Sequence, residues 1–151
     1  MSDEELVEAA AQTLLRVLTK VQADRRVARS YKTGEALTMI EMELCARIGD
    51  EPGITGSELA EYLGVTASAV SQVITKLTDK GHVRVERDKA NARIKHLHLT
   101  ASGKRAARAI HDRYQQMTTA VLGSSSTRDL KTTLRFLQNL EDFLDQARAE
   151  R

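Results

Sequence analysis

The sequence predicts a mainly α-helical fold of about six helices, with one β-hairpin of two or three strands in the second half of the chain. Apolar residues recur at helical spacing over most of the 151 residues, which include a single proline. Strict alternation of apolar and polar residues is confined to residues 82–99. The apolar content of 41% is sufficient for one buried core, and no apolar run approaches the length that spans a membrane.

Two helices are expected before the centre of the chain. The first covers about Asp3 to Arg29, where Ser2 or Asp3 can cap it and the acidic first turn suits the positive end of the helix dipole. It carries two adjacent apolar stripes, more than one neighbouring helix would cover. The second covers about Leu37 to Ile48, and Thr38 and Glu41 form a capping box at its start.

Residues 55–77 contain the pattern of two short helices joined by a tight turn. Thr55 and Glu58 form a capping box for the first helix, and Gly64 suits the left-handed conformation that ends it. Thr66 is placed to cap the second helix. The sequence therefore predicts a helical hairpin with a sharply defined turn.

The second helix of this hairpin separates inward apolar positions from outward polar ones. Val70, Ile74 and Leu77 recur at helical spacing and are expected to face inward. The outer face holds Ser68, Ser71, Gln72, Thr75 and Lys76. This arrangement is typical of a helix-turn-helix, whose second helix enters the DNA major groove, although an ordinary helical hairpin with a polar face is the alternative.

Two alternating segments follow and flank a polar turn at residues 88–92. Val83 and Val85 are expected to face inward on the first strand. The alternation slips by one residue between Ile94 and Leu97, which indicates a bulge or a late start of the second strand. A hairpin with a basic tip directly after the second helix predicts a winged helix-turn-helix.

The remaining sequence forms two long helices with more apolar surface than a monomer would bury. Thr100 caps a helix with a coiled-coil-like apolar seam, and Ser126 caps a last helix with two apolar faces. Two faces call for two packing partners, one of which can be another chain. The candidate dimerisation residues are Leu6, Leu14, Val17, Leu130, Leu134, Phe136, Leu137, Leu140 and Phe143.

The distribution of charge supports binding to nucleic acid. Residues 66–108 contain ten Lys or Arg and three acidic residues, whereas the whole chain has a formal charge of only +2, so that a basic middle lies between acidic flanks. The candidate DNA-binding residues lie on the second hairpin helix and the wing: Thr66, Ser68, Ser71, Gln72, Thr75, Lys76, Arg87, Lys89, Arg93 and Lys95. For Arg87, a structural ion pair with a nearby acid is an equally good interpretation.

Over Thr55 to Gly103 the sequence resembles the MarR family of bacterial and archaeal transcription regulators. The matching segments are Ser57-Glu58-Leu59-Ala60, Val65-Thr66-Ala67-Ser68-Ala69-Val70-Ser71-Gln72, Leu77-Thr78-Asp79-Lys80-Gly81, Glu86-Arg87 and Leu99-Thr100-Ala101-Ser102-Gly103. Helix order and chain length agree beyond them. In the family's wing, Asp-x-Arg usually lets the acid brace the arginine. Here the segment is Asn91-Ala92-Arg93, and Asp88 could substitute as the brace.

The resemblance implies one domain over residues 1–151. Residues 36–100 would form the winged DNA-binding lobe, and residues 1–35 and 101–151 the helical dimerisation region. It further implies a homodimeric, sequence-specific repressor on a palindromic double-stranded DNA operator. A small aromatic or anionic ligand, entering near the second helix and the start of the fifth, would release the DNA. A winged protein without effector that binds protein partners or acts architecturally is an alternative.

Other chemistry has little support in the sequence. Neither a catalytic arrangement nor a cofactor motif is visible, and a single cysteine with no signal peptide suits the cytoplasm. His96 and His98 face the same side of a strand and could form half of a metal site, but no metal site is expected. Cys45 is expected to be a buried inert thiol, with redox sensing as the alternative.

Overall fold

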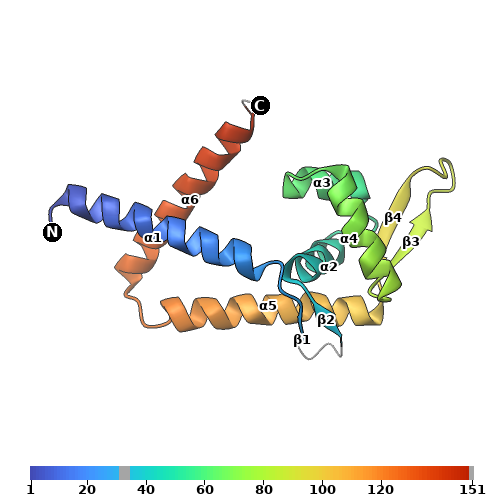
Figure 1. Cartoon of the computed structure of the whole chain (residues 1–151), viewed down its shortest axis with the longest axis horizontal. Helices are drawn as coiled ribbons and strands as arrows, with labels where there is room; N and C mark the ends of the chain where they lie inside the picture. The colour runs from blue at the N-terminus through green and yellow to red at the C-terminus, as the bar shows by residue number, and fades with distance from the viewer. Residues whose placement is uncertain (31–34, 150–151) are drawn as a thin grey trace. The chain divides into compact units, whose positions relative to one another are not determined.

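The computed structural model describes residues 1–30 and 35–149. Its helices and strands follow one another along the chain as Figure 1 shows. The helices are α1 (Asp3–Asp24), α2 (Met39–Asp50), α3 (Gly56–Leu63), α4 (Ala67–Asp79), α5 (Ala101–Leu122) and α6 (Thr127–Ala149). The strands are β1 (Arg29–Ser30), β2 (Ala36–Leu37), β3 (Val83–Arg87) and β4 (Lys95–Leu99). The chain divides after Asp112 into two compact units.

The predicted capping residues at the helix starts are confirmed, because each cap depends on side chains within one helical turn. Ser2, Thr38 and Thr55 each accept a hydrogen bond from the backbone N–H three residues on and complete a capping box. Thr66 caps α4 by accepting from the Ala69 N–H. Gly64 ends α3 at φ 63°, a left-handed conformation that costs glycine little.

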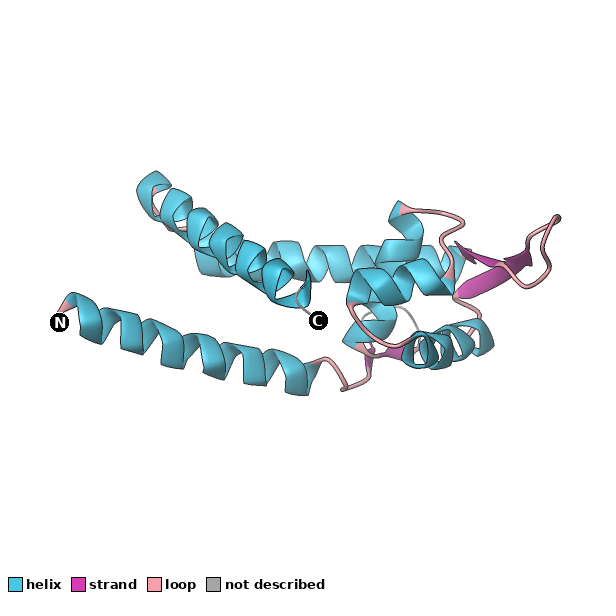
Figure 2. Cartoon of the chain, turned by 90° about the horizontal axis from the view of Figure 1, so that it is seen from above, coloured by secondary structure: helices cyan, strands magenta, loops and turns pink. Residues whose placement is uncertain are grey.

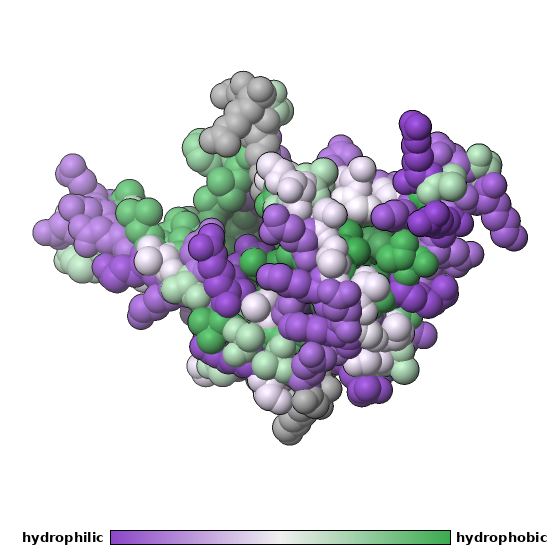
Figure 3. Space-filling model, turned by 45° about the vertical axis from the view of Figure 1, so that its right-hand side comes forward, coloured by the Kyte–Doolittle hydropathy of each residue, from purple (hydrophilic) through white to green (hydrophobic). Residues whose placement is uncertain are grey.

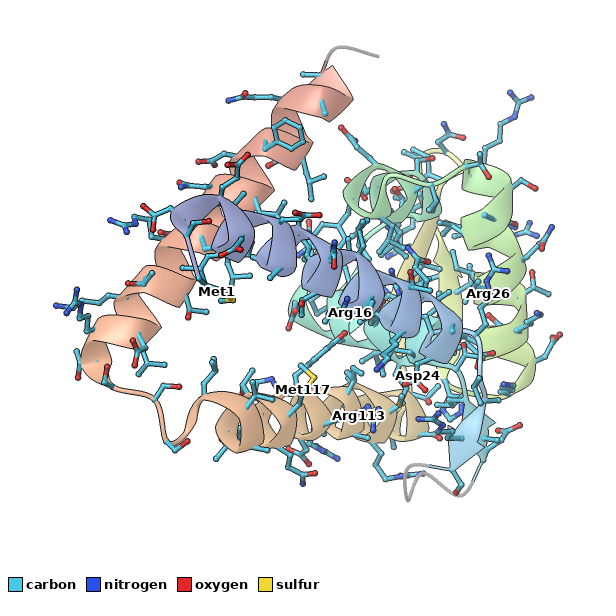
Figure 4. All side chains as sticks on the ribbon, turned by 60° about the vertical axis from the view of Figure 1, so that its left-hand side comes forward. Met1, Arg16, Asp24, Arg26, Arg113 and Met117 are labelled. Atoms are coloured by element: carbon cyan, nitrogen blue, oxygen red, sulfur yellow. The ribbon has the colours of Figure 1, made fainter. Side chains whose placement is uncertain are left out.

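The first two helix boundaries correct the sequence prediction. α1 ends at Asp24 instead of Arg29, and Asp24 forms an ion pair with Arg29 (Figure 4 labels Asp24 at the end of α1). Residues 29–30 instead pair antiparallel with β2, with Arg29 opposite Leu37. Leu37 is therefore a buried strand residue, and α2 begins only after the extended capping residue Thr38.

The core lies within the first unit, between α2, α3, α4, the wing and the first turns of α5. Its fully buried apolar side chains include Leu37, Met42, Leu44, Ile48, Leu59, Val70, Leu77, Leu97 and Ile110. By contrast, α1 contains no buried residue, and many large apolar side chains of α1 and α6 are exposed. Among the described residues, no helix is both long enough and apolar enough to cross a membrane.

The wing is the antiparallel pair β3–β4, drawn as magenta strands joined by a pink loop in Figure 2. β4 starts at Lys95, so the predicted late strand start is confirmed, and Ile94 before it is 40% exposed. A single bridge between Thr55 and His96 adds a third short segment. Val85 does not enter the core as expected: it is 39% exposed and borders a groove described below.

His82 joins the wing to the start of α5. Its side chain is buried, and its ring Nδ1 lies 2.8 Å from Oγ of Ser102. Its carbonyl accepts from the backbone N–H of Thr100 at 3.0 Å. Thr100 also accepts at Oγ1 from the Gly103 N–H, so the predicted cap of α5 is confirmed. These contacts fix where β3 begins relative to α5.

Candidate nucleic-acid interface

The outer face of α4 is exposed over its full length. The predicted inward residues Val70 and Leu77 are 2% and 0% exposed, and Ile74 is partly buried against the core. All the outward residues named from the sequence are exposed: Ser68, Ser71, Gln72, Thr75 and Lys76. The Thr75 hydroxyl donates to the Ser71 carbonyl at 2.9 Å, so its lone pairs remain available to an external donor.

The wing presents basic side chains beside this helix. Its predicted DNA-binding residues Arg87, Lys89, Arg93 and Lys95 are all exposed. The ion pairs on the described part of the wing are Arg84–Glu86, His96–Asp88 and His98–Glu86, and Arg87 belongs to none of them. The structural ion pair considered for Arg87 is therefore not formed. The wing, at the right of Figure 3, is largely hydrophilic.

A groove of about 600 Å³ lies between α4 and the wing. Ser71 and Thr75 from α4 and Arg93 and Lys95 from the wing line it, together with the start of α3. The remaining predicted residues, among them Gln72 and Lys76, do not line this groove. The fold therefore brings four of the predicted DNA-binding side chains together from two elements that are separate in sequence.

The tip of the wing is held differently from the sequence prediction. Oδ1 of Asp88 accepts the backbone N–H groups of Ala90 and Asn91, each at 2.8 Å. Oδ1 of Asn91 accepts the Arg93 N–H at 3.1 Å. Asp88 is thus not the brace of the Arg93 guanidinium, because its oxygens bind the backbone of the turn and His96. Hydrogen bonds from Asn91, His96 and Ala90 hold the pKa of Asp88 below its ordinary value.

Two histidines on β4 occupy separate environments. Nε2 of His96 lies 3.1 Å from Oδ2 of Asp88, and Nε2 of His98 lies 3.6 Å from Oε2 of Glu86. In the described ranges, no group of three or more His, Cys, Asp or Glu is arranged to hold a metal ion. Sequence reasoning missed the pairing of His96 with Asp88, since the two residues are eight positions apart and no local pattern links them.

Cys45 is fully buried in α2. Burial, with a smaller contribution from the negative charge of Glu41, raises the pKa of its thiol to about 12. Because the thiolate is the reactive form, the environment opposes oxidation or alkylation. The structure thus favours the inert thiol over the redox interpretation.

The fold and this surface together define a winged helix-turn-helix protein, a class that reads double-stranded DNA with a helix in the major groove. Residues 42–94 match the model of the MarR family. A 56-residue segment is 39% identical to the HTH-type transcriptional regulator PetP of Rhodobacter capsulatus and covers 37% of this chain and 34% of PetP. The matched segment thus spans about a third of that regulator's length.

Two solved structures extend the likeness of fold over most of the chain. FabT of Streptococcus pneumoniae, in complex with DNA, is 24% identical with a TM-score of 0.76, covering 97% of this chain and 99% of FabT. PcaV of Streptomyces coelicolor, in complex with its natural ligand, is 19% identical with a TM-score of 0.64, covering 88% and 89%. Residues 42–94 are therefore similar to the MarR family, and the fold of most of the chain is similar to that of FabT and PcaV.

Proposed function

We propose that this protein is a sequence-specific repressor that binds a palindromic double-stranded DNA operator as a homodimer in the cytoplasm. The observation that carries the proposal is the exposed polar face of α4, set beside four exposed basic side chains of the wing. FabT, which has the same fold, was solved with DNA, and PetP is named as a transcriptional regulator.

The side chains on α4 suit recognition of base edges. Gln72 is exposed and long enough to pair with adenine through two hydrogen bonds, while Ser68 and Ser71 can contact a base edge or a phosphate. Thr66 caps the N-terminus of α4, where backbone N–H groups favour an anionic phosphate. On the wing, Arg93 is the residue that we expect to enter a narrow minor groove.

The homodimer is supported by the apolar surface of the terminal helices. On α1, Leu6 and Val17 are 47% and 49% exposed; on α6, Leu134 and Phe143 are 57% and 66% exposed. Such surfaces are rare on soluble monomers. The Leu134→Asp variant should convert a dimer of 16.8 kDa chains into monomers in light scattering. The control Gln138→Asp, at an exposed polar position of α6, should remain dimeric. A monomeric wild-type protein at micromolar concentration would contradict the dimer.

The second part of the proposal is that a small aromatic or anionic ligand relieves repression. Its support is the likeness of fold to PcaV, whose natural ligand was present in its structure. Salicylate-like compounds are the first to test, by thermal shift and by release of bound DNA. If a broad panel of aromatic acids changes neither the melting temperature nor the DNA affinity, the protein is a regulator without this kind of effector.

Selection of bound fragments from the genome of the source organism tests the DNA proposal directly. We expect enrichment of a palindromic site whose half-sites are centred about one helical turn apart, roughly 34 Å. The Gln72→Ala protein should enrich a more degenerate site. Recovery of fragments without a shared site would leave only non-specific binding and would refute sequence-specific repression.

A further inference from the structure

The imidazole ring of His96 lies between two hydrogen-bond acceptors. Its Nδ1 is 2.8 Å from the carbonyl oxygen of Gly53, and its Nε2 is 3.1 Å from Oδ2 of Asp88. A carbonyl and an ionised carboxylate can only accept. A neutral imidazole has one N–H and can satisfy one of them, whereas the imidazolium cation has two N–H groups and satisfies both. The geometry is therefore complete only when His96 carries two protons.

The charges around His96 also favour the cation. Glu86 is its cross-strand partner on β3, Asp88 is its hydrogen-bond partner in the turn, and the Glu58 carboxylate on α3 interacts with it electrostatically. The other titratable neighbour is His98, whose Nε2 faces Glu86 at 3.6 Å. The hydrogen bond to Gly53, followed by the one to Asp88, raises the pKa of His96 above its ordinary value.

The two acceptors belong to different parts of the molecule. Gly53 lies in the loop between α2 and α3, and its N–H donates to the Leu97 carbonyl at 2.9 Å. Asp88 lies in the turn at the wing tip, where its other oxygen holds the N–H groups of Ala90 and Asn91. His96 therefore connects the helical lobe to the turn that leads into Arg93.

We propose that His96 is a positioning residue for DNA binding: its imidazolium clamps the wing tip to the α2–α3 loop, and its deprotonation releases one side of the clamp. This proposal rests on the proposed function, because its consequence is a change in DNA affinity. The wing tip carries Lys89 and Arg93, and their approach to DNA depends on where this turn is held. The wing contact thus becomes sensitive to proton concentration.

The direction of this effect follows from the raised pKa. The clamp is complete below the ordinary histidine pKa of about 6.5 and is lost as the pH rises through the higher pKa of the folded state. DNA affinity should accordingly be highest below about pH 6.5 and should fall as the pH rises above that value. A loss of about five- to tenfold is expected, the equivalent of one hydrogen bond.

Two measurements on the full-length protein test the proposal. In an NMR titration of the imidazole C–H signals, His96 should titrate above an ordinary histidine, and Asp88→Asn should lower that midpoint. Fluorescence anisotropy with the operator selected above should show the pH-dependent loss of affinity for the wild type. His96→Gln has no titrating proton and should bind with little pH dependence, near the wild-type value at high pH. The matched control His98→Gln, on the same strand, should keep the wild-type slope.

The possible failures are distinguishable. If His96→Gln keeps the wild-type pH dependence, or if His96 titrates as an ordinary histidine, the clamp is refuted while DNA binding stands. If the wild type binds no DNA at any pH, the proposed function fails, and the role of His96 in DNA binding fails with it. A raised His96 pKa in the NMR titration would then show a clamp that serves only the fold.

Discussion

Nζ of Lys80 lies 2.9 Å from Oε1 of Glu41, a buried carboxylate on α2. Lys80 is the C-terminal cap residue of α4, and its ammonium also donates to the Ala36 carbonyl at 3.1 Å. One side chain thus attaches the end of α4 to both α2 and β2. The direction in which α4 presents its outer face depends on this attachment.

Removal of the ammonium should destabilise the lobe. Lys80→Met leaves the Glu41 carboxylate buried without its cationic partner, and we expect a loss of about 2–3 kcal/mol in the free energy of unfolding, since Lys80 itself is partly exposed. Lys76→Met, at an exposed position of the same helix, should change it by less than about 0.5 kcal/mol. Urea denaturation measures the free energy of unfolding of both variants. Equal midpoints for the two variants would show that the pair contributes no net stability.

The Glu41 carboxylate should also make the stability of the fold depend on pH. Burial on its own would raise the pKa of Glu41, but hydrogen bonds from Thr38 and Lys80 outweigh it and lower the pKa. A carboxyl with a lowered pKa contributes stability above the unfolded pKa of about 4.3, and this is lost as the pH falls through the folded value. Glu41→Gln should therefore show a shallower loss of stability below about pH 4.5 than the wild type. An unchanged acid slope in the variant would contradict this assignment.

Gly103 should not tolerate alanine, although alanine usually favours a helix. A Cβ at this position would lie 2.1 Å from the carbonyl oxygen of His82 and 3.0 Å from Cδ2 of Leu99. The backbone junction between β3 and α5 would have to move, at a cost of about 1–3 kcal/mol in unfolding free energy. Gly56→Ala is the control, because its Cβ would meet only Cδ1 of Ile74 at 3.4 Å. Thermal denaturation of both variants checks the difference, and equal melting temperatures would argue against a tight junction.

The features that the sequence predicts correctly are those coded by neighbouring residues. Thr55 with Glu58, and Thr66 before α4, act within one helical turn, so the pattern alone locates these helix starts. The two-residue strands β1 and β2 are too short to show alternation, so the sequence pattern predicts a helix at Leu37 where the structure has a strand. Contacts such as Lys80–Glu41 join residues far apart in sequence, and no local pattern indicates them.

The candidate site likewise contains one part that the sequence predicts and another that it does not. Helical periodicity alone predicts which residues face outward on α4, and the exposure of Gln72 and its neighbours agrees with it. The partner of Asp88 is not predictable, because Asp88 can cap a turn, brace an arginine or bind a histidine with the same side chain. Only the positions of the Ala90 N–H, the Asn91 N–H and the His96 ring decide between these roles.

Cys45 should be chemically inert in the folded protein. Its thiol is fully buried and its pKa is about 12, so very little thiolate is present at neutral pH. Iodoacetamide should modify it at a negligible rate in native buffer and rapidly in denaturant, as mass spectrometry can follow. Both the wild-type protein and the Cys45→Ala variant should keep their DNA binding after peroxide treatment. Loss of wild-type binding on mild oxidation, prevented by Cys45→Ala, would restore the redox interpretation.

The final prediction separates the contribution of α4 to DNA binding from that of the wing. Gln72 projects from the exposed face of α4, so Gln72→Ala should remove a base contact worth about 1–3 kcal/mol and relax the preference at one position in each half-site. The dependence of log affinity on log salt should hardly change, since no phosphate charge is lost. Affinity measurements on operator variants at several salt concentrations give both quantities.

Arg93→Ala should change DNA binding in a different way from Gln72→Ala. Arg93 is an exposed cation at the wing tip, and Asn91 holds its backbone but not its guanidinium. Binding should weaken for all sequences, and the salt slope should fall by about 0.9 for each lost phosphate neutralisation, which a dimer loses twice. If Arg93→Ala changes neither affinity nor slope, the wing does not contact DNA. The assignment of α4 would survive that result, because Gln72 acts on a separate element and is judged by sequence preference alone.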